Sequence, residues 1–346
     1  MKKHSFVKNK KRNDGKTAVL LVNTGTPENP SVFAVARFLS EFLNDPMVIN
    51  LPWLLRKILV NCIIVPFRSY KSSKRYKKLW NNKDFPLRIH GNKVRNLLQE
   101  KLKGNDKVFF AMRYGKPSLS SVLKEIKKER FSNLVVLPMF PQYSSSTTGS
   151  IDKFVKKDVK KWKVQPKLKI IQQFYDNPLF IQTIGQRIKE CQPEKYDIIL
   201  FSYHGLPIKY IEKIHPEVSV SECTCEKSMP PYGSLCYRAT CFDTTRKIMK
   251  YLGDKTLKYK VTFQSHMSKN WLQPYTDRTL INLAEQGIKR VLIVSPSFVA
   301  DCLETEVEIS MEYSHLFKQH CGEKLKLVES LNEHPLWIEA LYKMIR

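Results

Sequence analysis

The sequence predicts an α/β protein built from two similar domains, each with a parallel sheet covered by helices on both faces. Three observations support this fold class. Apolar runs of strand length alternate with amphipathic runs of helix length along the whole chain. The apolar runs show no polar alternation, which is typical of parallel strands that are buried on both faces. The two halves of the chain also repeat the same patterns in the same order.

The repeat is clearest in two pairs of segments. Residues 19–27, VLLVNTGTP, resemble residues 199–207, ILFSYHGLP, and both read as a strand followed by x-Gly-x-Pro. Residues 136–140, VLPMF, resemble residues 294–298, VSPSF. The glycine allows a tight turn at the carboxyl end of the strand, and the proline ends the strand. We therefore expect a ligand cleft between the two sets of carboxyl-terminal loops.

The strands and helices follow from these runs in chain order. Continuous apolar runs predict strands at 17–23, 108–113, 134–139, 168–172, 197–202, 260–264, 291–295 and 325–329. Apolar residues at helical spacing predict helices at 32–43, 93–103, 119–130, 178–190, 244–252, 275–286, 304–320 and 335–345.

These elements divide the chain into four parts. Residues 1–16 are polar and basic without an apolar core, so they predict a disordered tail and not a secretory signal. Residues 17–176 form the first domain, with an apolar lip at 47–80. Residues 177–333 form the second domain, with a cysteine-rich insert at 221–241. Residues 334–346 are expected to form a terminal helix that crosses back to the first domain.

Charge and composition narrow the classes of function. The net charge is +27, which fits either an acidic partner or a lysine-rich solvated surface. The charge is spread over the chain without an aromatic-flanked basic motif, so nucleic-acid binding is not expected. The most apolar stretch, 51–67, is too short and too interrupted by charge to span a membrane. Eight cysteines without an export signal indicate a reducing compartment, so we expect a cytoplasmic protein.

A histidine and a row of acids are the first chemical candidates. His204 ends a buried strand just before Gly205, where a neutral imidazole could accept a proton or bind a metal; the alternative is a structural histidine. Glu304, Glu308 and Glu312 recur every four residues and should share one helix face. They could pass protons outward or guide a cation inward. The alternative is a solvated acidic face at the start of a helix.

An apolar segment followed by basic residues is the second candidate. Residues 51–67 lead into Arg68, Lys71 and further lysines. This combination suits a segment at a membrane surface, or a wall and rim for a flat, acid-tailed substrate. An ordinary buried helix with a charged edge is the alternative. The sequence contains no GxGxxG and no P-loop motif, so nucleotide chemistry has no specific support.

Four cysteines crowd into nineteen residues and form the third candidate. They are Cys223, Cys225, Cys236 and Cys241. Four thiols this close, in a loop rich in proline and glycine, indicate a metal site. Zinc and iron–sulfur clusters both accept four thiolates, and the spacing does not choose between them.

Taken together, these segments resemble the ferrochelatases, which insert ferrous iron into a porphyrin at the end of haem synthesis. The resemblance runs from about residue 17 to the end of the chain. The segments that carry it are LLVNTGTP, AMRYGKPS, LPMFPQYSSSTTGS, FSYHGLP, FQSHMSKNWLQPYTD and SPSFVADCLETEVEI. It implies a chelatase-like fold of two Rossmann-like domains, each a parallel four-stranded sheet flanked by helices, with a cleft between them.

The resemblance also implies roles for single residues. His204 and Glu304 match the catalytic pair, which also handles the substrate metal, and Glu308 and Glu312 match a path for protons or metal. The positions that match porphyrin-binding residues are Thr24, Arg68, Lys71, Tyr76, Arg113, Tyr114, Ser265, Trp271 and Phe298. The implied substrates are protoporphyrin IX and Fe²⁺. Coproporphyrin III as the porphyrin, or a non-catalytic porphyrin- or haem-binding protein, are the alternatives.

The remaining expectations concern a cofactor and a membrane. The 221–241 insert resembles the internal cluster arrangement of some bacterial ferrochelatases, so the resemblance implies a [2Fe–2S] cluster on Cys223, Cys225, Cys236 and Cys241, with zinc as the second choice. Peripheral contact with the cytoplasmic face of the inner membrane is also expected. No nucleic-acid partner is expected.

Overall fold

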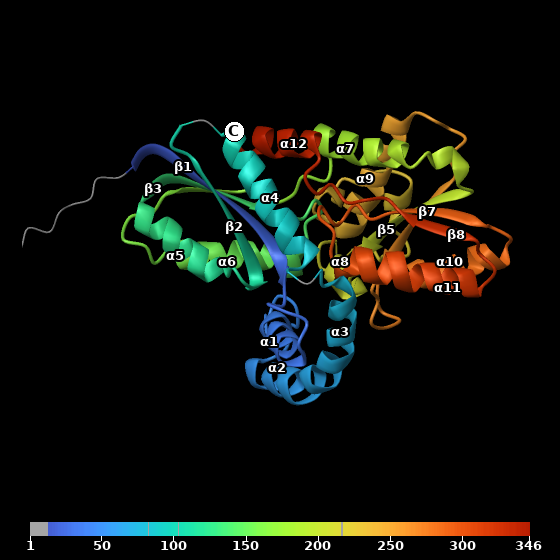
Figure 1. The fold of residues 1–346 in the computed structure, drawn as a ribbon, viewed down its shortest axis with the longest axis horizontal. Helices are drawn as coiled ribbons and strands as arrows, with labels where there is room; N and C mark the ends of the chain where they lie inside the picture. The colour runs from blue at the N-terminus through green and yellow to red at the C-terminus, as the bar shows by residue number, and fades with distance from the viewer. Residues whose placement is uncertain (1–12, 82, 103, 216) are drawn as a thin grey trace, which may run out of the picture.

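Two parallel sheets of identical strand order form the body of the protein (Figure 1). The computed structural model describes residues 13–81, 83–102, 104–215 and 217–346. The first sheet has the order β2-β1-β3-β4 and the second the order β6-β5-β7-β8. The strands are β1 (Asn13–Thr26), β2 (Lys107–Gly115), β3 (Phe131–Pro138), β4 (Lys167–Ile170), β5 (Ile198–His204), β6 (Tyr259–Gln264), β7 (Arg290–Val294) and β8 (Lys324–Leu327). The predicted fold of two parallel α/β sheets is confirmed.

The helices of the structure differ from the predicted helices in their number and, in one case, in their type. In the first half they are α1 (Val32–Leu43), α2 (Trp53–Ile58), η1 (Leu59–Ile64), α3 (Val65–Leu79), α4 (Pro86–Lys101), α5 (Leu119–Glu129), η2 (Ser145–Gly149) and α6 (Ser150–Val159). In the second half they are α7 (Pro178–Glu190), η3 (Pro193–Lys195), α8 (Ile208–Glu212), η4 (Thr224–Glu226), η5 (Gly233–Leu235), α9 (Tyr237–Leu252), α10 (Thr276–Glu285), η6 (Leu303–Tyr313), α11 (Ser314–Gln319) and α12 (Pro335–Ile345). The sequence analysis missed α6, and the helix expected at 304–320 is a π-helix, η6, continued by α11.

The first strand begins earlier than the predicted end of the basic tail. The basic tail was placed at 1–16, but β1 already begins at Asn13 and pairs there with Phe131 of β3. Residues 1–12 of that tail lie outside the described residues.

The strands are buried because helices cover both faces of each sheet. Residues 18–22 of β1 are at most 2 % exposed. Alternate side chains of β1 enter different cores: Val19 and Leu21 pack in one cluster, while Leu20 and Val22 pack in another. This double burial explains the unbroken apolar run that predicted a parallel strand.

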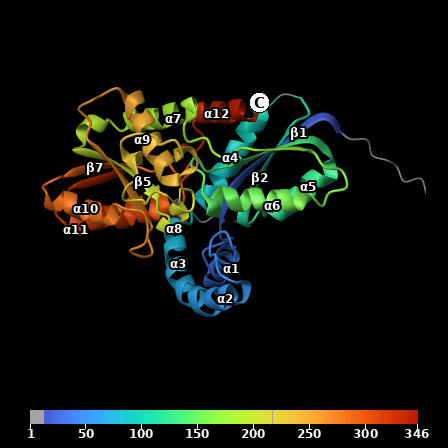
Figure 2. The same cartoon turned by 180° about the vertical axis from the view of Figure 1, so that it is seen from behind.

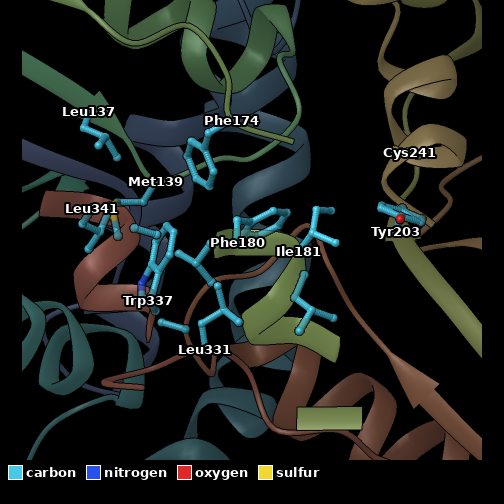
Figure 3. Close-up of a cluster of buried hydrophobic side chains, with 14 of the residues drawn as sticks. Leu137, Met139, Phe174, Phe180, Ile181, Tyr203, Cys241, Leu331, Trp337 and Leu341 are labelled. Atoms are coloured by element: carbon cyan, nitrogen blue, oxygen red, sulfur yellow. The ribbon is translucent and has the colours of Figure 1, made fainter. Parts of the chain in front are cut away.

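One apolar core is shared by both sheets, and α12 lies within it (Figure 3). Trp337 of α12 is fully buried, with its ring centroid 5.5 Å from that of Phe174 and 6.1 Å from that of Phe180. The helix contacts both α7 and α4, and Lys101 of α4 forms an ion pair with Glu339 at 2.6 Å. The terminal helix of the second half is therefore held against the first half by apolar packing and by this ion pair.

The lip projects from the body as α2, η1 and α3, beside α1 (Figures 1 and 2). Its outer side is apolar: Trp53 is 65 % exposed and Phe67 is 80 % exposed. Its inner side packs on the second half of the chain, since α3 contacts η6. Within the described ranges, no helix is long and apolar enough to cross a membrane.

Candidate functional site

His204 stands at the carboxyl end of β5 and is half-buried. Its ring centroid lies 6.5 Å from that of Trp271 and 6.2 Å from that of Phe298. The Nδ1 atom lies 2.7 Å from the carbonyl oxygen of Gly205. A carbonyl only accepts hydrogen bonds, so this contact places the proton on Nδ1. Nε2 is the ring nitrogen that this contact leaves for accepting a proton or binding a metal.

Glu304 lies in the first turn of η6. A single residue of β6, Gln264, contacts both this turn and the end of β5. Gln264 is paired with His204 in the sheet, and its side-chain amide donates to the backbone carbonyl of Glu304 at 3.2 Å. The structure therefore brings His204 and Glu304 to the same edge of the second sheet. The sequence analysis did not single out Gln264, and its burial inside a polar network gives no sequence signal.

The other two acids of the row are paired with neighbouring side chains. Ser265 donates to the carboxylate of Glu308 at 2.7 Å, and Tyr313 donates to the same carboxylate at 2.8 Å. Burial and the charge of Glu308 raise the pKa of Tyr313, so its hydroxyl stays protonated. Arg75 of α3 lies 2.8 Å from Glu312 and 3.8 Å from Glu308. A cation of the lip thus offsets two acids of η6, a pairing that the sequence analysis missed.

Tyr76 connects the lip with η6, the helix that carries Glu304. It is buried on α3, in the same apolar cluster as Val307 of η6. Burial raises the pKa of Tyr76, and the nearby charge of Glu304 adds to the shift. The phenol is therefore neutral at any physiological pH. Among the residues expected to bind porphyrin, Tyr76 is near enough to Glu304 to feel its charge.

Arg113 and Tyr114 are held by an acid that the sequence analysis overlooked. Arg113 pairs with Asp45 at 2.5 Å, and the Tyr114 hydroxyl donates to the same carboxylate oxygen at 2.9 Å. Ser150 donates to it as well, at 2.6 Å. Burial opposes ionisation of Asp45, but hydrogen bonds from Ser150 and the Met47 amide, together with the Arg113 charge, lower its pKa. Tyr114 is buried, and its ring packs in the same apolar cluster as Tyr76.

The remaining expected porphyrin-binding positions lie apart from one another. Arg68 and Lys71 are exposed on α3, beyond the apolar side chains of the lip. Thr24 lies near the carboxyl end of β1 in the first sheet, where its amide donates to the Asn23 side chain at 2.8 Å. Ser265 adopts a positive φ of 61° and turns its hydroxyl to Glu308. The structure thus places Ser265 with the acid row, whereas Arg68 and Lys71 lie on the lip.

The four cysteines of the insert are free, buried thiols in one loop region. Arg238 donates to the Cys225 sulfur at 2.8 Å, and the Cys236 sulfur lies 3.4 Å from Nε2 of His215. Burial raises the pKa of Cys225 to about 12. Burial opposes ionisation of Cys223 too, but hydrogen bonds from Tyr232 and the Cys225 amide lower its pKa.

The donor set fits a thiolate-bound group in its chemistry, because four buried sulfurs lie next to a guanidinium that would offset their charge. Among the residues that the structure describes, no group of three or more His, Cys, Asp or Glu side chains is arranged to hold a metal ion. The insert is nevertheless connected to the site. Tyr237, directly after Cys236, donates to the backbone carbonyl of His204 at 2.8 Å.

Comparison of the fold with solved structures gives two chelatases. One is SirB from Bacillus subtilis with Fe³⁺, with a TM-score of 0.54 and 10 % identity, covering 95 % of this chain and 93 % of that one. The other is the sirohydrochlorin chelatase SirB from Bacillus subtilis subspecies spizizenii in complex with cobalt, with a TM-score of 0.52 and 9 % identity, covering 96 % and 94 %. At this identity the similarity shows the chelatase-like fold alone.

Comparison of the sequence gives much closer relatives. A ferrochelatase from Coxiella burnetii (strain Dugway 5J108-111) is 40 % identical over 343 residues, which covers 97 % of this chain and 94 % of the relative. A ferrochelatase from Legionella pneumophila (strain Paris) is 39 % identical over 331 residues, covering 94 % and 98 %. The ferrochelatase family model matches residues 16–346. This chain belongs to the ferrochelatase family.

Proposed function

We propose that this ferrochelatase, a metal chelatase of haem synthesis, acts as a lyase that inserts Fe²⁺ into protoporphyrin IX and releases two protons, with His204 and Glu304 as its catalytic residues. The observation that carries these roles is the placement of His204 at the end of β5, near the rings of Trp271 and Phe298, with its Nδ1 atom held by the Gly205 carbonyl and Nε2 left for a substrate. Glu304 is fixed at the same edge of the sheet through Gln264.

The mechanism follows from the chemistry of the substrate. A flat porphyrin directs its nitrogen lone pairs into the ring plane and carries two N–H protons. Bending the macrocycle turns the lone pairs outward, and the cost of bending must come from binding energy at the walls. Trp271, Phe298 and Tyr76 are the aromatic wall residues of this proposal. Nε2 of His204 accepts pyrrole protons, and Glu304, Glu308 and Glu312 serve the passage of protons and Fe²⁺.

The fluorescence of the free porphyrin tests the reaction directly. Under anaerobic conditions the protein with Fe²⁺ should remove the fluorescence of protoporphyrin IX. The variant His204→Ala should fold as the wild type does and lose this activity by about two orders of magnitude or more. Equal turnover by His204→Ala would exclude the role of His204.

The same assay separates the two alternatives. Faster turnover of coproporphyrin III than of protoporphyrin IX would identify that porphyrin as the substrate. Tight porphyrin binding without turnover of either would identify a non-catalytic binding protein. The extended apolar lip favours protoporphyrin, which carries fewer carboxylates than coproporphyrin.

The thiols of the insert are the second part of the proposal. Cys223, Cys225, Cys236 and Cys241 would hold a [2Fe–2S] cluster, with zinc as the second choice. A bound cluster supplies one-electron redox chemistry. We expect purified protein to be reddish-brown, and Cys236→Ser to lose that absorbance while Cys321→Ser, outside the insert, keeps it. Colourless protein that contains zinc would overturn the cluster.

The lip is the third part of the proposal. Exposed apolar side chains lie next to exposed Arg68, Lys71 and Lys74, which suits peripheral binding to an anionic membrane surface. We therefore place the protein in the cytoplasm, in contact with the inner membrane. Phe67→Ser should weaken sedimentation with phosphatidylglycerol vesicles, whereas Val164→Ser, an exposed apolar residue far from the lip, should not. Equal sedimentation of both variants would contradict a lip contact.

The division of the chain remains part of the proposal as well. We assign 17–176 and 177–333 to the two domains, and 334–346 to the segment that joins them. The packing of α12 on α4 and α7 supports this division.

A further inference from the structure

Gln264 is the last residue of β6 and is fully buried between the two catalytic positions. Its backbone carbonyl accepts from the amide of Gly205 at 2.8 Å, directly after His204. Its side-chain amide nitrogen donates to the backbone carbonyl of Glu304 at 3.2 Å. One residue therefore holds both the turn that carries the imidazole and the first turn of η6, which carries the acid.

The backbone carbonyl of Glu304 decides which way the amide of Gln264 points, because a carbonyl only accepts hydrogen bonds and the NH₂ group must therefore face it. Oε1 then faces the hydroxyls of Ser202 and Ser295, at 2.8 Å and 3.1 Å. Behind Ser202, the hydroxyls of Thr276 and Thr262 continue the chain at 2.9 Å each. All of these side chains are buried, so the network is satisfied internally and rigid.

We propose that Gln264 is a positioning residue that sets the placement of Glu304 relative to His204. The inference rests on the proposed function, because it assumes that these two residues carry the reaction. Gln264 is fully buried behind the end of the sheet, so its side chain is not offered to a substrate. A hydrophobic side chain at this position could not donate to the Glu304 carbonyl, so the start of η6 would shift. A displacement of about 1 Å at a reacting group can cost about a hundredfold in rate.

The proposal makes a kinetic prediction that a purely structural role would not make. The variant Gln264→Met keeps the volume and loses the amide. We expect kcat/KM for Fe²⁺ to fall at least tenfold, while the dissociation constant for protoporphyrin IX, from fluorescence titration without metal, stays within twofold. The porphyrin walls are unchanged, and only the placement of the acid is altered.

Gln142 offers a matched control for the loss of a buried amide. It is equally buried, and its amide donates to Thr244 at 3.1 Å in a different part of the molecule. Gln142→Met should lower the thermal midpoint about as much as Gln264→Met and leave kcat/KM for Fe²⁺ within twofold. If Gln264→Met does not fold, Ser202→Ala serves in its place, since it keeps Gln264 but removes a hydroxyl that donates to Oε1 of the amide. A smaller fall in the same kinetic parameter is then expected.

Three outcomes would overturn the inference: unchanged kinetics in both Gln264→Met and Ser202→Ala, an equal kinetic loss in Gln142→Met, or a loss of porphyrin affinity as large as the loss in kcat/KM. The failure of the proposed function is a separate result. It would appear as turnover by His204→Ala equal to that of the wild type, whatever Gln264→Met does.

Discussion

The two sheets share their strand order but finish their first strands differently. In the first half, β1 carries Thr24 and Gly25 just before its end at Thr26, and the neighbouring strand β2 supplies Arg113, which is paired with Asp45 just ahead of the lip. In the second half, β5 ends at His204-Gly205, and the neighbouring strand supplies Gln264, which is tied to Glu304. The equivalent edge of the sheet thus carries an ion pair in the first half and a half-buried imidazole in the second. The two halves share one topology, and the residues at this edge are what distinguish them.

Two glycines with a positive φ, Gly25 in the first half and Gly287 in the second, give the largest expected difference in stability. A Cβ on Gly25 would lie 1.8 Å from the Tyr114 carbonyl oxygen, and the residue has a φ of +122°. We expect Gly25→Ala to lower the free energy of unfolding by more than about 5 kcal/mol, measured by urea denaturation. Gly287→Ala has a similar positive φ with open space around it, so it should cost only about 1 kcal/mol. Equal losses in both variants would show that the contact at Gly25 is relieved.

Trp337 tests whether the halves unfold together. Trp337→Ala removes a buried ring from the core that both sheets share, and should cost about 3–5 kcal/mol. Trp162→Ala removes a ring from the core of the first half alone. We expect only Trp337→Ala to split the unfolding transition, so that probes in the two halves no longer coincide. Coincident transitions in both variants would contradict a joining role for α12.

Asp45 gives a smaller effect with a defined pH dependence. Because its pKa is lowered in the folded protein, its contribution is fully present above the unfolded pKa of about 4 and is lost as the pH falls through the folded value. Asp45→Asn should therefore cost about 1–3 kcal/mol at pH 7 and flatten the fall in stability below pH 4. Asp152→Asn, an acid paired with exposed Lys156, serves as the control. An unchanged acid limb in Asp45→Asn would refute this assignment.

The smallest effect is expected at the ion pair between the lip and η6. Arg75 and Glu312 are both partly exposed, so Glu312→Gln should change the free energy of unfolding by less than about 1 kcal/mol. If Glu312 serves the passage of Fe²⁺, the KM for Fe²⁺ should rise several-fold in the same variant. A stability loss above 2 kcal/mol would mean that the pair holds the lip in place.

Sequence patterns predicted the sheets well because the central strands, such as β1 and β5, are buried on both faces and therefore read as unbroken apolar runs. They predicted the position of His204 for the same reason, since it ends such a run. Gln264 and Asp45 escaped prediction because their importance lies in long-range contacts, to Glu304 and to Arg113, that no local pattern encodes. The π-helical form of η6 was missed because acids four residues apart fit an α-helix equally well.

The placement of α12 has a consequence for the order of events during synthesis. Its residues follow every strand of both sheets along the chain, yet Trp337 fills the space between the two halves. On the ribosome, both sheets can form before this helix has emerged. Until then, Phe174 and Phe180 lack the indole that covers them, and the nascent chain exposes an apolar surface to solvent.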